Sequence, residues 1–372
     1  MKSYSRDTLS QFSQLETIHV VPGGQRNKLL EGILGNEFVK HGVVSIYAPD
    51  DDLSTFCRNR LIPFQNLGFI KKNSVRQALE LYVFIRKVRP KSVYLHSFYP
   101  SAMGLVLCFF QRKVIPVPVR HHNQVFHLSR NRKGVFVDKV VNFVSPHIVA
   151  VSDSVKSTMI KEGCSAKKIH VIKNGMNTPA RAYDQKSSPS DEFQLKILAI
   201  GRIDWQKNYE GMFKIIRSLK EKQIAITLNI LGTGDEAYRQ ELQELVSSYS
   251  IEKNISWLGW QEDVQSWIEG SDVLLHTAKD EACPLVLIEA LQSGIPIVST
   301  NAGGCAEVLY SFYEGIEPFD SERYVDELLK IKSDLNSANV YARSIIERAQ
   351  AKYGVHKMRN EYKQFSEYLS GF

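Results

Sequence analysis

Residues 276–307 read HTAKDEACPLVLIEALQSGIPIVSTNAGGCAE. The apolar run at 273–275, just before them, is typical of a strand buried in a parallel sheet. Pro284 suits the first turn of a helix, and Gly294 predicts the end of that helix. A second strand is expected over 297–299, before the glycine pair at 303–304. The stretch therefore predicts two neighbouring strand ends in an α/β sheet, which is where such sheets bind ligands.

Two carboxylates belong to this stretch, Glu281 in the predicted loop and Glu289 in the predicted helix. At one strand end, each could hold hydroxyl groups, one set on a sugar and the other on a ribose. Backbone N–H groups at the helix start would face an anion or sugar hydroxyls. Most surface carboxylates are simply solvated, so the pair alone leaves a binding site and a solvated helix face both open.

The order of these residues resembles the signature of the family 4 retaining glycosyltransferases, the glycosyl transferases of group 1. The signature consists of Glu-x7-Glu, then Gly-Ile-Pro-Ile-Val and Gly-Gly-x-x-Glu. One departure is Ala282, where the family usually has glycine; alanine narrows the allowed backbone dihedrals. The resemblance implies the GT-B fold, an α/β architecture of two Rossmann-like doubly wound domains that face a cleft. Alternating predicted strands and helices in both halves indicate the same class.

The resemblance also divides the chain. Residues 1–177 are expected to form an N-terminal, acceptor-side domain, and 194–354 a C-terminal domain that binds the nucleotide sugar. The segment 178–193 between them contains Pro179, Pro189 and several serines without periodicity, which predicts a linker. In GT-B enzymes the last helix crosses back onto the first domain, so residues 355–372 are expected to pack there.

The segment 201–208, GRIDWQKN, follows a predicted strand at 195–200 and carries a second family motif. An arginine fork and a lysine point charge can together clasp a diphosphate. The resemblance implies that Arg202 and Lys207 stabilise the departing diphosphate, and that Glu281 holds sugar hydroxyls with the amides of 283–285. Glu289 would hold the ribose hydroxyls. The donor-binding residues expected are Gly23, Gly24, Asn174, Gly201, Gly232, Gly234, Cys283, Pro284, Leu285, Val286 and Glu289.

Gly232-x-Gly234-x-x-Ala237 has the spacing of a dinucleotide-binding fingerprint. It follows a strand expected over 224–231, in the middle of the second domain, rather than an opening strand. No acidic residue stands about 20 residues further on, where the fingerprint requires one. This disfavours a dehydrogenase, and the family has a Gly-x-Gly near the nucleotide here.

The first domain opens with a strand at 17–21, the loop Pro22-Gly23-Gly24 and a helical pattern of Leu30, Leu34 and Phe38. Gly42 is expected to close that helix before a strand at 43–47, and a later helix is expected over 79–88. The acidic run at 50–52 contains the D-x-D string of metal-dependent enzymes, but its position favours a turn and helix cap. No metal and no cofactor are expected.

A histidine pair, His121 and His122, follows a strand predicted over 115–119. In the family, a histidine at this place contacts the donor sugar or its reacting edge. The alignment favours His122, and His121 stays open as the alternative. One of the two is expected to be satisfied by local backbone contacts instead. With Arg202, Lys207 and Glu281, these histidines complete the predicted catalytic set.

Composition and charge bound the remaining possibilities. Five scattered cysteines without metal-ligand spacing favour a reducing cytosol, and neither a signal peptide nor an apolar run of about 18 residues is recognised. Residues 1–178 carry 26 Lys and Arg against 11 Asp and Glu, whereas the rest carries 21 against 29. The basic half predicts an anionic partner. That partner could be a phosphorylated acceptor, an anionic membrane face or nucleic acid, and nucleic acid is the least supported because no nucleic-acid motif is present. The basic cluster at 130–139 could be a membrane-surface patch, an acceptor patch or a solvated loop. A merely solubilising charge is the alternative for the whole basic half.

The predicted function is that of a retaining, metal-independent hexosyltransferase. It would move a hexosyl or N-acetylhexosaminyl group from a nucleotide-diphosphate sugar, with UDP-sugars favoured and GDP-mannose next. The acceptor would be a glycan or polyprenyl-diphosphate-linked glycan in bacterial surface polysaccharide synthesis, at the cytoplasmic face of the membrane or in the cytoplasm. The alternatives are a GT-B epimerase or hydrolase of nucleotide sugars and a non-catalytic nucleotide-sugar binding protein.

Overall fold

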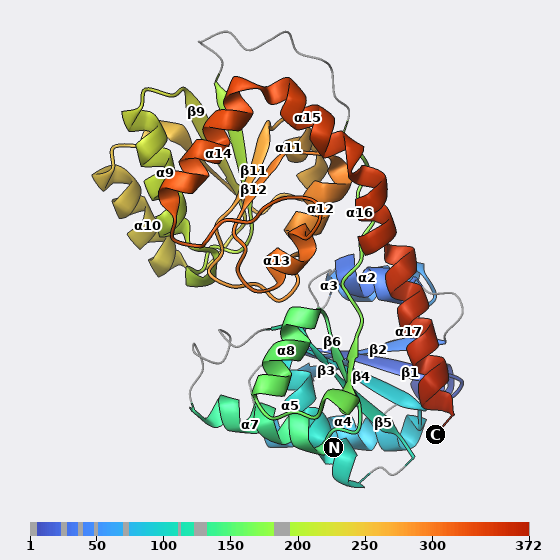
Figure 1. Ribbon diagram of the computed structural model, residues 1–372. Coiled ribbons are helices and arrows are strands. Elements are labelled where there is room, and N and C mark those ends of the chain that lie inside the picture. The colour runs from blue at the N-terminus through green and yellow to red at the C-terminus, as the bar shows by residue number, and fades with distance from the viewer. Residues whose placement is uncertain are drawn as a thin grey trace. The chain divides into compact units, whose positions relative to one another are not determined.

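The computed structural model of the chain describes residues 6–23, 28–35, 40–47, 51–69, 74–110, 113–122, 132–181 and 194–371 (Figure 1). The chain divides by its internal contacts into two compact units. One consists of Met1–Gly175 together with Val355–Phe372, and the other of Met176–Gly354. Each unit is built on a parallel sheet with its own hydrophobic core.

The first unit contains a seven-stranded sheet in the order β3-β2-β1-β4-β5-β6-β7, and every pairing is parallel. Its strands are β1 (Thr17–Val21), β2 (His41–Tyr47), β3 (Phe64–Phe69), β4 (Ser92–His96), β5 (Ile115–Arg120), β6 (Ile148–Ala150) and β7 (Ile169–Val171). Its helices are α1 (Arg6–Phe12), α2 (Lys28–Leu34), α3 (Asp51–Asn59), α4 (Ser74–Val88), α5 (Phe98–Phe110), α7 (Arg132–Val144), α8 (Asp153–Lys161) and α17 (Val355–Ser370), with a 3-10 turn at Ala166–Lys168. Because both faces of such a sheet are covered, β1 and β4 are buried along their whole length.

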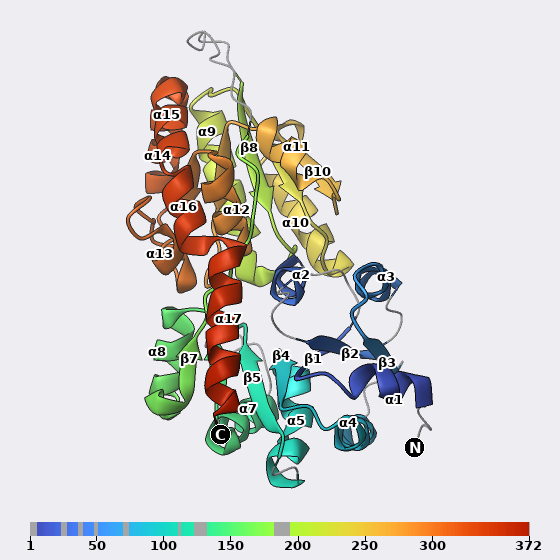
Figure 2. The same ribbon diagram turned by 90° about the vertical axis from the view of Figure 1, so that its right-hand side faces the viewer.

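The two faces of this sheet have different cores. On one face Ile18 and Val20 of β1 pack with apolar residues of α1, α4 and α5. On the other face Tyr94 of β4 contacts Tyr362 and Phe365 of α17, edge to face. The buried residues of α17 include Met358, Tyr362, Phe365 and Leu369, one stripe at helical spacing. Figure 2 shows α17 lying along the sheet of this unit. The chain's last helix thus belongs to the first unit.

Three expected boundaries in the chain were wrong. Gly42 does not end a helix but lies inside β2, where a Cβ would come within 2.3 Å of the Leu15 side chain. The helix expected from Leu79 begins at Ser74, and the strand expected from Ile224 begins at Ile226. Leu30 and Leu34 are buried in α2 as their spacing predicted, whereas Phe38 lies outside the described residues.

The second unit contains a five-stranded parallel sheet in the order β10-β9-β8-β11-β12. Its strands are β8 (Leu195–Ile200), β9 (Ile226–Leu231), β10 (Ile255–Gly259), β11 (Val273–His276) and β12 (Ile297–Ser299). Its helices are α9 (Tyr209–Glu221), α10 (Glu236–Ser248), α11 (Val264–Glu269), α12 (Leu285–Ser293), α13 (Gly304–Leu309), α14 (Ser321–Ser333), α15 (Leu335–Ser344) and α16 (Ile346–Tyr353), with 3-10 turns η2 (Trp205–Lys207) and η3 (Glu252–Asn254). The strand order reverses between β8 and β11, and such a reversal is where doubly wound sheets bind ligands.

The predicted linker at 178–193 lies outside the described residues from 182 onward. Its first residues contact the second unit: the Thr178 N–H donates to Gln292 Oε1 at 2.9 Å, and Arg181 Nε donates to the Gly294 carbonyl at 3.3 Å. Arg181 is buried. The described beginning of this segment is therefore attached to the second unit by hydrogen bonds.

Candidate active site

The loop after β8 is shaped by its own side chains. Asp204 caps the turn η2 by accepting hydrogen bonds from the Gln206 N–H at 3.1 Å and the Lys207 N–H at 3.3 Å. The next residue, Asn208, has a φ of 56° and is buried, and its Nδ2 donates to the Pro318 carbonyl at 3.2 Å. An asparagine tolerates this left-handed conformation better than most residues. The sequence DWQKN thus folds into a tight turn that fixes the backbone of Lys207.

Hydrogen bonds join this turn to the loop after β11, which the sheet order places next to it. The Lys279 N–H donates to the Gln206 carbonyl at 2.8 Å, and Thr277 Oγ1 donates to the Lys207 carbonyl at 3.0 Å. Gln206 Nε2 donates to the Asp280 carbonyl at 3.3 Å. Two motifs more than 70 residues apart in sequence therefore form one rigid surface at the switch point.

The centre of this surface is an ion pair between Lys207 Nζ and Glu281 Oε1. Only 19% and 17% of these two side chains are exposed, so the pair is largely withdrawn from water. His276 Nε2 lies 3.5 Å from the same Glu281 oxygen. Burial alone would raise the pKa of Glu281, but the Lys207 ammonium and the His276 ring outweigh it and lower that pKa to about 2. Glu281 is therefore a carboxylate at any physiological pH and can only accept hydrogen bonds.

His276 was missed as a site residue by the sequence analysis, although it opens the stretch quoted first. It is the last residue of β11 and is buried. Its Nδ1 lies 3.3 Å from Ser299 Oγ and 3.9 Å from Cys305 Sγ. Burial lowers the pKa of His276, and the nearby Glu281 opposes part of that change. The sequence feature that could have identified His276 is its position at the carboxyl end of the strand predicted over 273–275.

The side chain of Arg202 is far less constrained than that of Lys207. Its side chain is 77% exposed, and its NH2 lies 3.2 Å from Asp204 Oδ2. An exposed pair of this kind contributes little to stability. Arg202 can therefore turn toward an incoming anion, whereas Lys207 is held in place by Glu281.

Two predicted donor-binding glycines, Gly232 and Gly234, have a packing reason to be glycine. A Cβ on Gly232 would lie 1.8 Å from the Gly201 carbonyl oxygen, and a Cβ on Gly234 would lie 1.9 Å from that of Ile203. Gly201 and Gly232 have φ values of 159° and 143°. The loops after β8 and β9 thus cross at backbone contact, which only residues without a side chain permit.

The start of α12 lies beside Glu281. Pro284 takes the cap position rather than the predicted first turn, and Leu285 is the first helical residue. Cys283, Pro284 and Val286 are buried, and Glu289 is half-buried further along the helix. The predicted end at Gly294 is confirmed, with a φ of 74°. The turn at 303–304 closes over this loop: the Gly304 N–H donates to the Glu281 carbonyl at 2.6 Å, and a Cβ there would lie 2.0 Å from the Ala282 oxygen.

The other predicted site residues belong to the first unit. Gly23 directly follows β1, Asn174 is buried after β7, and Gly24 lies outside the described residues. His122 Nε2 lies 3.0 Å from Asp138 Oδ2, and His121 Nε2 lies 3.4 Å from His96 Nδ1. Both histidines follow β5, as predicted, and both have side-chain partners. Which of them faces a donor sugar stays a prediction.

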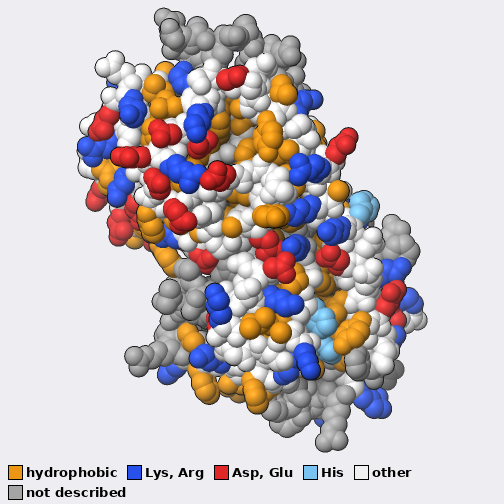
Figure 3. Space-filling view, in the orientation of Figure 1, with side chains coloured by type: hydrophobic (Ala, Val, Ile, Leu, Met, Phe, Trp, Pro, Cys, Tyr) orange, Lys and Arg blue, Asp and Glu red, His pale blue; other side chains and the backbone are white. Residues whose placement is uncertain are grey.

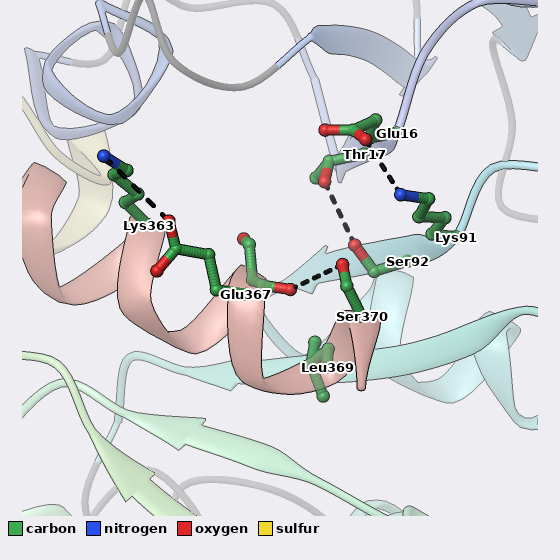
Figure 4. A pocket seen from close by; sticks show the side chains of 9 residues that line it. Glu16, Thr17, Lys91, Ser92, Lys363, Glu367, Leu369 and Ser370 are labelled. Carbon is green, nitrogen blue, oxygen red and sulfur yellow. Dashed lines mark hydrogen bonds and ion pairs between the residues drawn. The ribbon is translucent and has the colours of Figure 1, made fainter. Parts of the chain in front are cut away.

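A pocket of about 330 Å³ lies at the amino edge of the first unit's sheet, opposite the carboxyl edge that the predicted site residues follow. Residues around the amino ends of β1 and β4 and the last turns of α17 line it, among them Glu16, Thr17, Lys91, Ser92, Lys363 and Glu367 (Figure 4). Lys91 Nζ pairs with Glu16 Oε1 at 2.9 Å across it. None of the predicted site residues lines this pocket.

The part of the chain that the structure describes holds no group of three or more His, Cys, Asp or Glu placed to bind a metal ion. Asp51 and Asp52, of the predicted D-x-D string, begin α3. In the described ranges of the chain, no helix has both the length and the apolar character needed to span a membrane.

Two family models match adjacent parts of the chain that do not overlap. Glycosyltransferase Family 4 matches residues 34–179, and Glycosyl transferases group 1 matches residues 181–350. The chain belongs to glycosyltransferase family 4. Its curated relatives include the lipopolysaccharide 1,6-galactosyltransferase of Escherichia coli K12, 25% identical over 330 residues that cover 81% of this chain and 86% of that protein.

Other proteins are similar to the chain over different lengths. An Escherichia coli UDP-Gal:alpha-D-GlcNAc-diphosphoundecaprenol alpha-1,3-galactosyltransferase is 22% identical over 304 residues, 75% of this chain and 74% of that protein. The chain spans about half the length of the WcaL glycosyltransferase of Escherichia coli K12, at 26% identity over 214 residues. Anabaena HepE, solved with UDP and glucose, superposes with a TM-score of 0.80 at 17% identity, covering 96% of this chain and all of that one. These likenesses confirm the GT-B fold.

Proposed function

We propose that the chain is a retaining, metal-independent hexosyltransferase that uses a nucleotide-diphosphate sugar, with UDP-hexoses first. The observation that carries the proposal is the Lys207–Glu281 pair at the switch point between β8 and β11. We assign the Lys207 ammonium to the diphosphate and the neighbouring Glu281 carboxylate to the sugar hydroxyls. The choice of UDP is supported by HepE, which was solved with UDP-glucose, and by the UDP-Gal donor in the name of one relative.

The chemistry we infer depends on charge that is already in place before the reaction. As the bond between the anomeric carbon and the diphosphate oxygen breaks, negative charge grows on the diphosphate. Lys207 meets that charge from a fixed position, and the exposed Arg202 adds a planar fork. Glu281, ionised throughout, accepts hydrogen bonds from sugar hydroxyls, and Glu289 accepts those of the ribose. The departing oxygen takes the acceptor's proton on the same sugar face.

For the acceptor we propose a glycan, free or linked to a polyprenyl diphosphate, in bacterial surface polysaccharide synthesis. Relatives named for lipopolysaccharide and for a diphosphoundecaprenol substrate support this class. We further propose that the first unit binds an anionic membrane face through α7. Phe136 and Phe143, two turns apart on α7, are 68% and 82% exposed, and Lys133 and Lys139 on the same helix are exposed as well. Apolar side chains gather along the lower edge of that unit in Figure 3, where α7 lies.

The test is a thermal-shift screen against UDP, GDP, ADP, TDP and CMP in the presence of EDTA, followed by sugar-transfer assays with the selected donor class. We expect UDP to raise the melting temperature without added metal and UDP-hexoses to be consumed. A shift with a different diphosphate would replace UDP but keep the site. Consumption of the donor without transfer to any glycan acceptor would favour a hydrolase or epimerase, and a shift that requires Mg²⁺ would refute metal independence.

A further inference from the structure

The pocket of about 330 Å³ at the amino edge of the first unit's sheet has two walls (Figure 4). One wall consists of the first residues of β1 and β4 and the residues just before them. The other wall is formed by the last two turns of α17. Both walls belong to the same compact unit, so the pocket is defined by contacts within that unit alone.

Each wall carries one lysine and one glutamate. Lys91 Nζ lies 2.9 Å from Glu16 Oε1 on the sheet side, and Lys363 Nζ lies 3.9 Å from Glu367 Oε1 on the helix side. The two charges of each pair cancel, so the lining as a whole favours neither an anion nor a cation. All four side chains are partly exposed, and exposed pairs of this kind are weak. Their ammonium protons and carboxylate oxygens can therefore also bond to a neutral polar ligand.

Two buried hydroxyl groups lie in the sheet wall. Thr17 and Ser92 are 2% and 3% exposed, and Thr17 Oγ1 lies 3.1 Å from Ser92 Oγ, within hydrogen-bond distance. This contact uses only one of the two hydroxyl protons. Among the described residues, neither side chain has a second hydrogen bond that would take the other proton. A buried donor without a partner costs free energy, so the pair favours an occupant with an acceptor oxygen.

The helix wall adds further hydroxyl groups and an apolar surface. Ser366 Oγ lies 3.2 Å from Tyr94 OH, and Ser370 Oγ donates to the Ser366 carbonyl at 3.0 Å. Leu369 contributes a buried apolar side chain to the lining. Donors and acceptors on both walls thus surround a space with an apolar patch. A sugar ring has the matching chemistry, because each of its hydroxyls both donates and accepts while the C–H faces of the ring are apolar.

We propose that this pocket binds one sugar residue of a neutral glycan. The carboxylates of Glu16 and Glu367 accept hydrogen bonds from ring hydroxyls, since one carboxylate has acceptor sites for two neighbouring hydroxyl groups. The spare proton of the Thr17–Ser92 pair bonds to a sugar oxygen. Pockets for small molecules enclose about 300–1,000 Å³, so a volume of about 330 Å³ suits a ligand of one or two sugar rings.

The role of this site rests on the proposed function, in which the acceptor is a glycan. A sugar held here lies outside the predicted donor site, because none of the predicted site residues lines the pocket. A glycan attached at a second place dissociates more slowly than one held at its reacting end alone. The pocket would thus keep a glycan chain on the enzyme.

Saturation-transfer difference NMR on the full chain tests the class of ligand. The probes are the methyl glycosides of galactose, glucose, mannose and N-acetylglucosamine, with glycine as a zwitterionic comparison. We expect signals from at least one glycoside and none from glycine. Binding of glycine alone, or of none of the probes, would overturn the proposal.

The substitution Ser370→Trp tests whether the sugar binds in this pocket. Ser370 is exposed and lines the pocket, so the indole should fill the space without disturbing the core. Glycoside binding should weaken by about tenfold or more, since the indole occupies the ligand's place. Gln364→Trp is the matched control and should bind as the wild type does, because Gln364 is exposed on the same helix and does not line the pocket. Equal affinities of the two variants would place the glycoside elsewhere and refute the site.

The substitution Thr17→Val tests the contribution of the buried hydroxyls. Valine has nearly the shape of threonine, so the change removes the hydroxyl group and leaves the packing. Loss of one hydrogen bond should weaken glycoside binding by about three- to tenfold. Thr227→Val, the same substitution in β9 of the second unit, should have no effect. Unchanged binding in folded Thr17→Val would contradict the proposal; if that variant does not fold, Ser370→Trp decides alone.

The proposed function has a separate measurement. UDP should raise the melting temperature of the wild type and of Ser370→Trp equally, because no predicted donor-binding residue is changed. If UDP has no effect while glycosides bind in the pocket, the donor assignment fails and the pocket stands. If UDP raises the melting temperature and no glycoside binds, the sugar pocket alone is refuted.

Discussion

Lys207 and Arg202 lie five residues apart, yet their side chains are held very differently. Lys207 is fixed between a capped turn and Glu281, while the Arg202 side chain is 77% exposed. A charge that is already in position needs no reorganisation when the diphosphate leaves, and this is the larger contribution to such catalysis. Of the two, Lys207 is therefore the residue on which turnover should depend more.

Replacing Lys207 with alanine should lower kcat by about 10²–10³-fold, the usual cost of removing one charge-stabilising group. The change also leaves the buried Glu281 without its ammonium, so donor binding should weaken. Initial rates of donor consumption measure both effects. Lys222→Ala, at the exposed end of α9, is the control and should keep the wild-type rate. Equal rates in Lys207→Ala and the control would show that the leaving-group assignment is wrong.

Replacing Gly232 with alanine should destabilise the second unit. Alanine there would place its Cβ 1.8 Å from the Gly201 oxygen at a φ of 143°. Overpacking of this kind typically costs about 1–3 kcal/mol, in addition to the backbone strain. Gly259→Ala is the matched control, because its φ of 67° is strained as well but nothing lies within 4 Å of its Cβ. Urea denaturation should show a larger loss for Gly232→Ala; equal losses would mean that the crossing of the two loops can relax.

At the scale of elements, α7 has an outward face that the first unit's core does not use. Phe136 and Phe143 are exposed on it, while Asp138 and Val141 are buried. A helix with aromatic residues and lysines toward solvent can lie in a membrane interface, with its apolar side chains among the lipids. The basic balance of residues 1–178 adds attraction to anionic lipids.

The double substitution Phe136→Ser and Phe143→Ser should lower binding to vesicles of anionic phospholipid by about tenfold or more, since burying a phenylalanine contributes about 1.5–3 kcal/mol. Vesicle co-sedimentation measures the binding. Phe319→Ser in the second unit, 74% exposed in the wild type, removes an equally accessible aromatic ring as the control. Binding should also fall as salt rises. If the double variant and the control sediment alike, α7 is not the membrane-binding element.

At the scale of the whole molecule, the two units should respond differently to acid. The first unit buries His19, His41 and His96 in its sheet, and the pKa of each is lowered by burial. An unfolded histidine binds a proton below about pH 6.5, whereas these rings stay neutral until the pH is far lower. Below pH 6.5 the unfolded state therefore binds more protons than the folded state, and the free energy of unfolding decreases as the pH is lowered.

Each ring that stays neutral in the folded state should lower the free energy of unfolding by about 1.4 kcal/mol for every pH unit below 6.5. We expect the melting transition of the first unit to fall between pH 7.5 and pH 5.5, and that of the second unit to change less. Calorimetry of the full chain at the two pH values measures both. His41→Gln should reduce the acid sensitivity. Equal stability of the first unit at pH 7.5 and 5.5 would show that these rings are protonated without loss of structure.

Local sequence patterns predicted doubly wound α/β sheets in both halves of the chain and the positions of several of their elements. Hydrophobic runs and the stop at Gly294 are local properties, and they predicted β8, β11 and α12. The GT-B class and the roles of Arg202 to Glu289 were expected from the resemblance to family 4. The boundary at Gly42 failed because that glycine serves packing against Leu15, a contact that local pattern does not record.

Which side chains meet depends on contacts between segments that lie far apart in the chain. The order β8-β11 places Lys207 against Glu281, and His276 joins them because β11 ends there. The crossing of two loops gives Gly232 a packing role, whereas the family resemblance had placed it only near the nucleotide. His41, His19, His96 and His121 lie ring to ring, at 2.9–3.4 Å between nitrogens, because of the register of β2, β1, β4 and β5. Register is set by packing between segments far apart in the chain, so no local sequence pattern contains it.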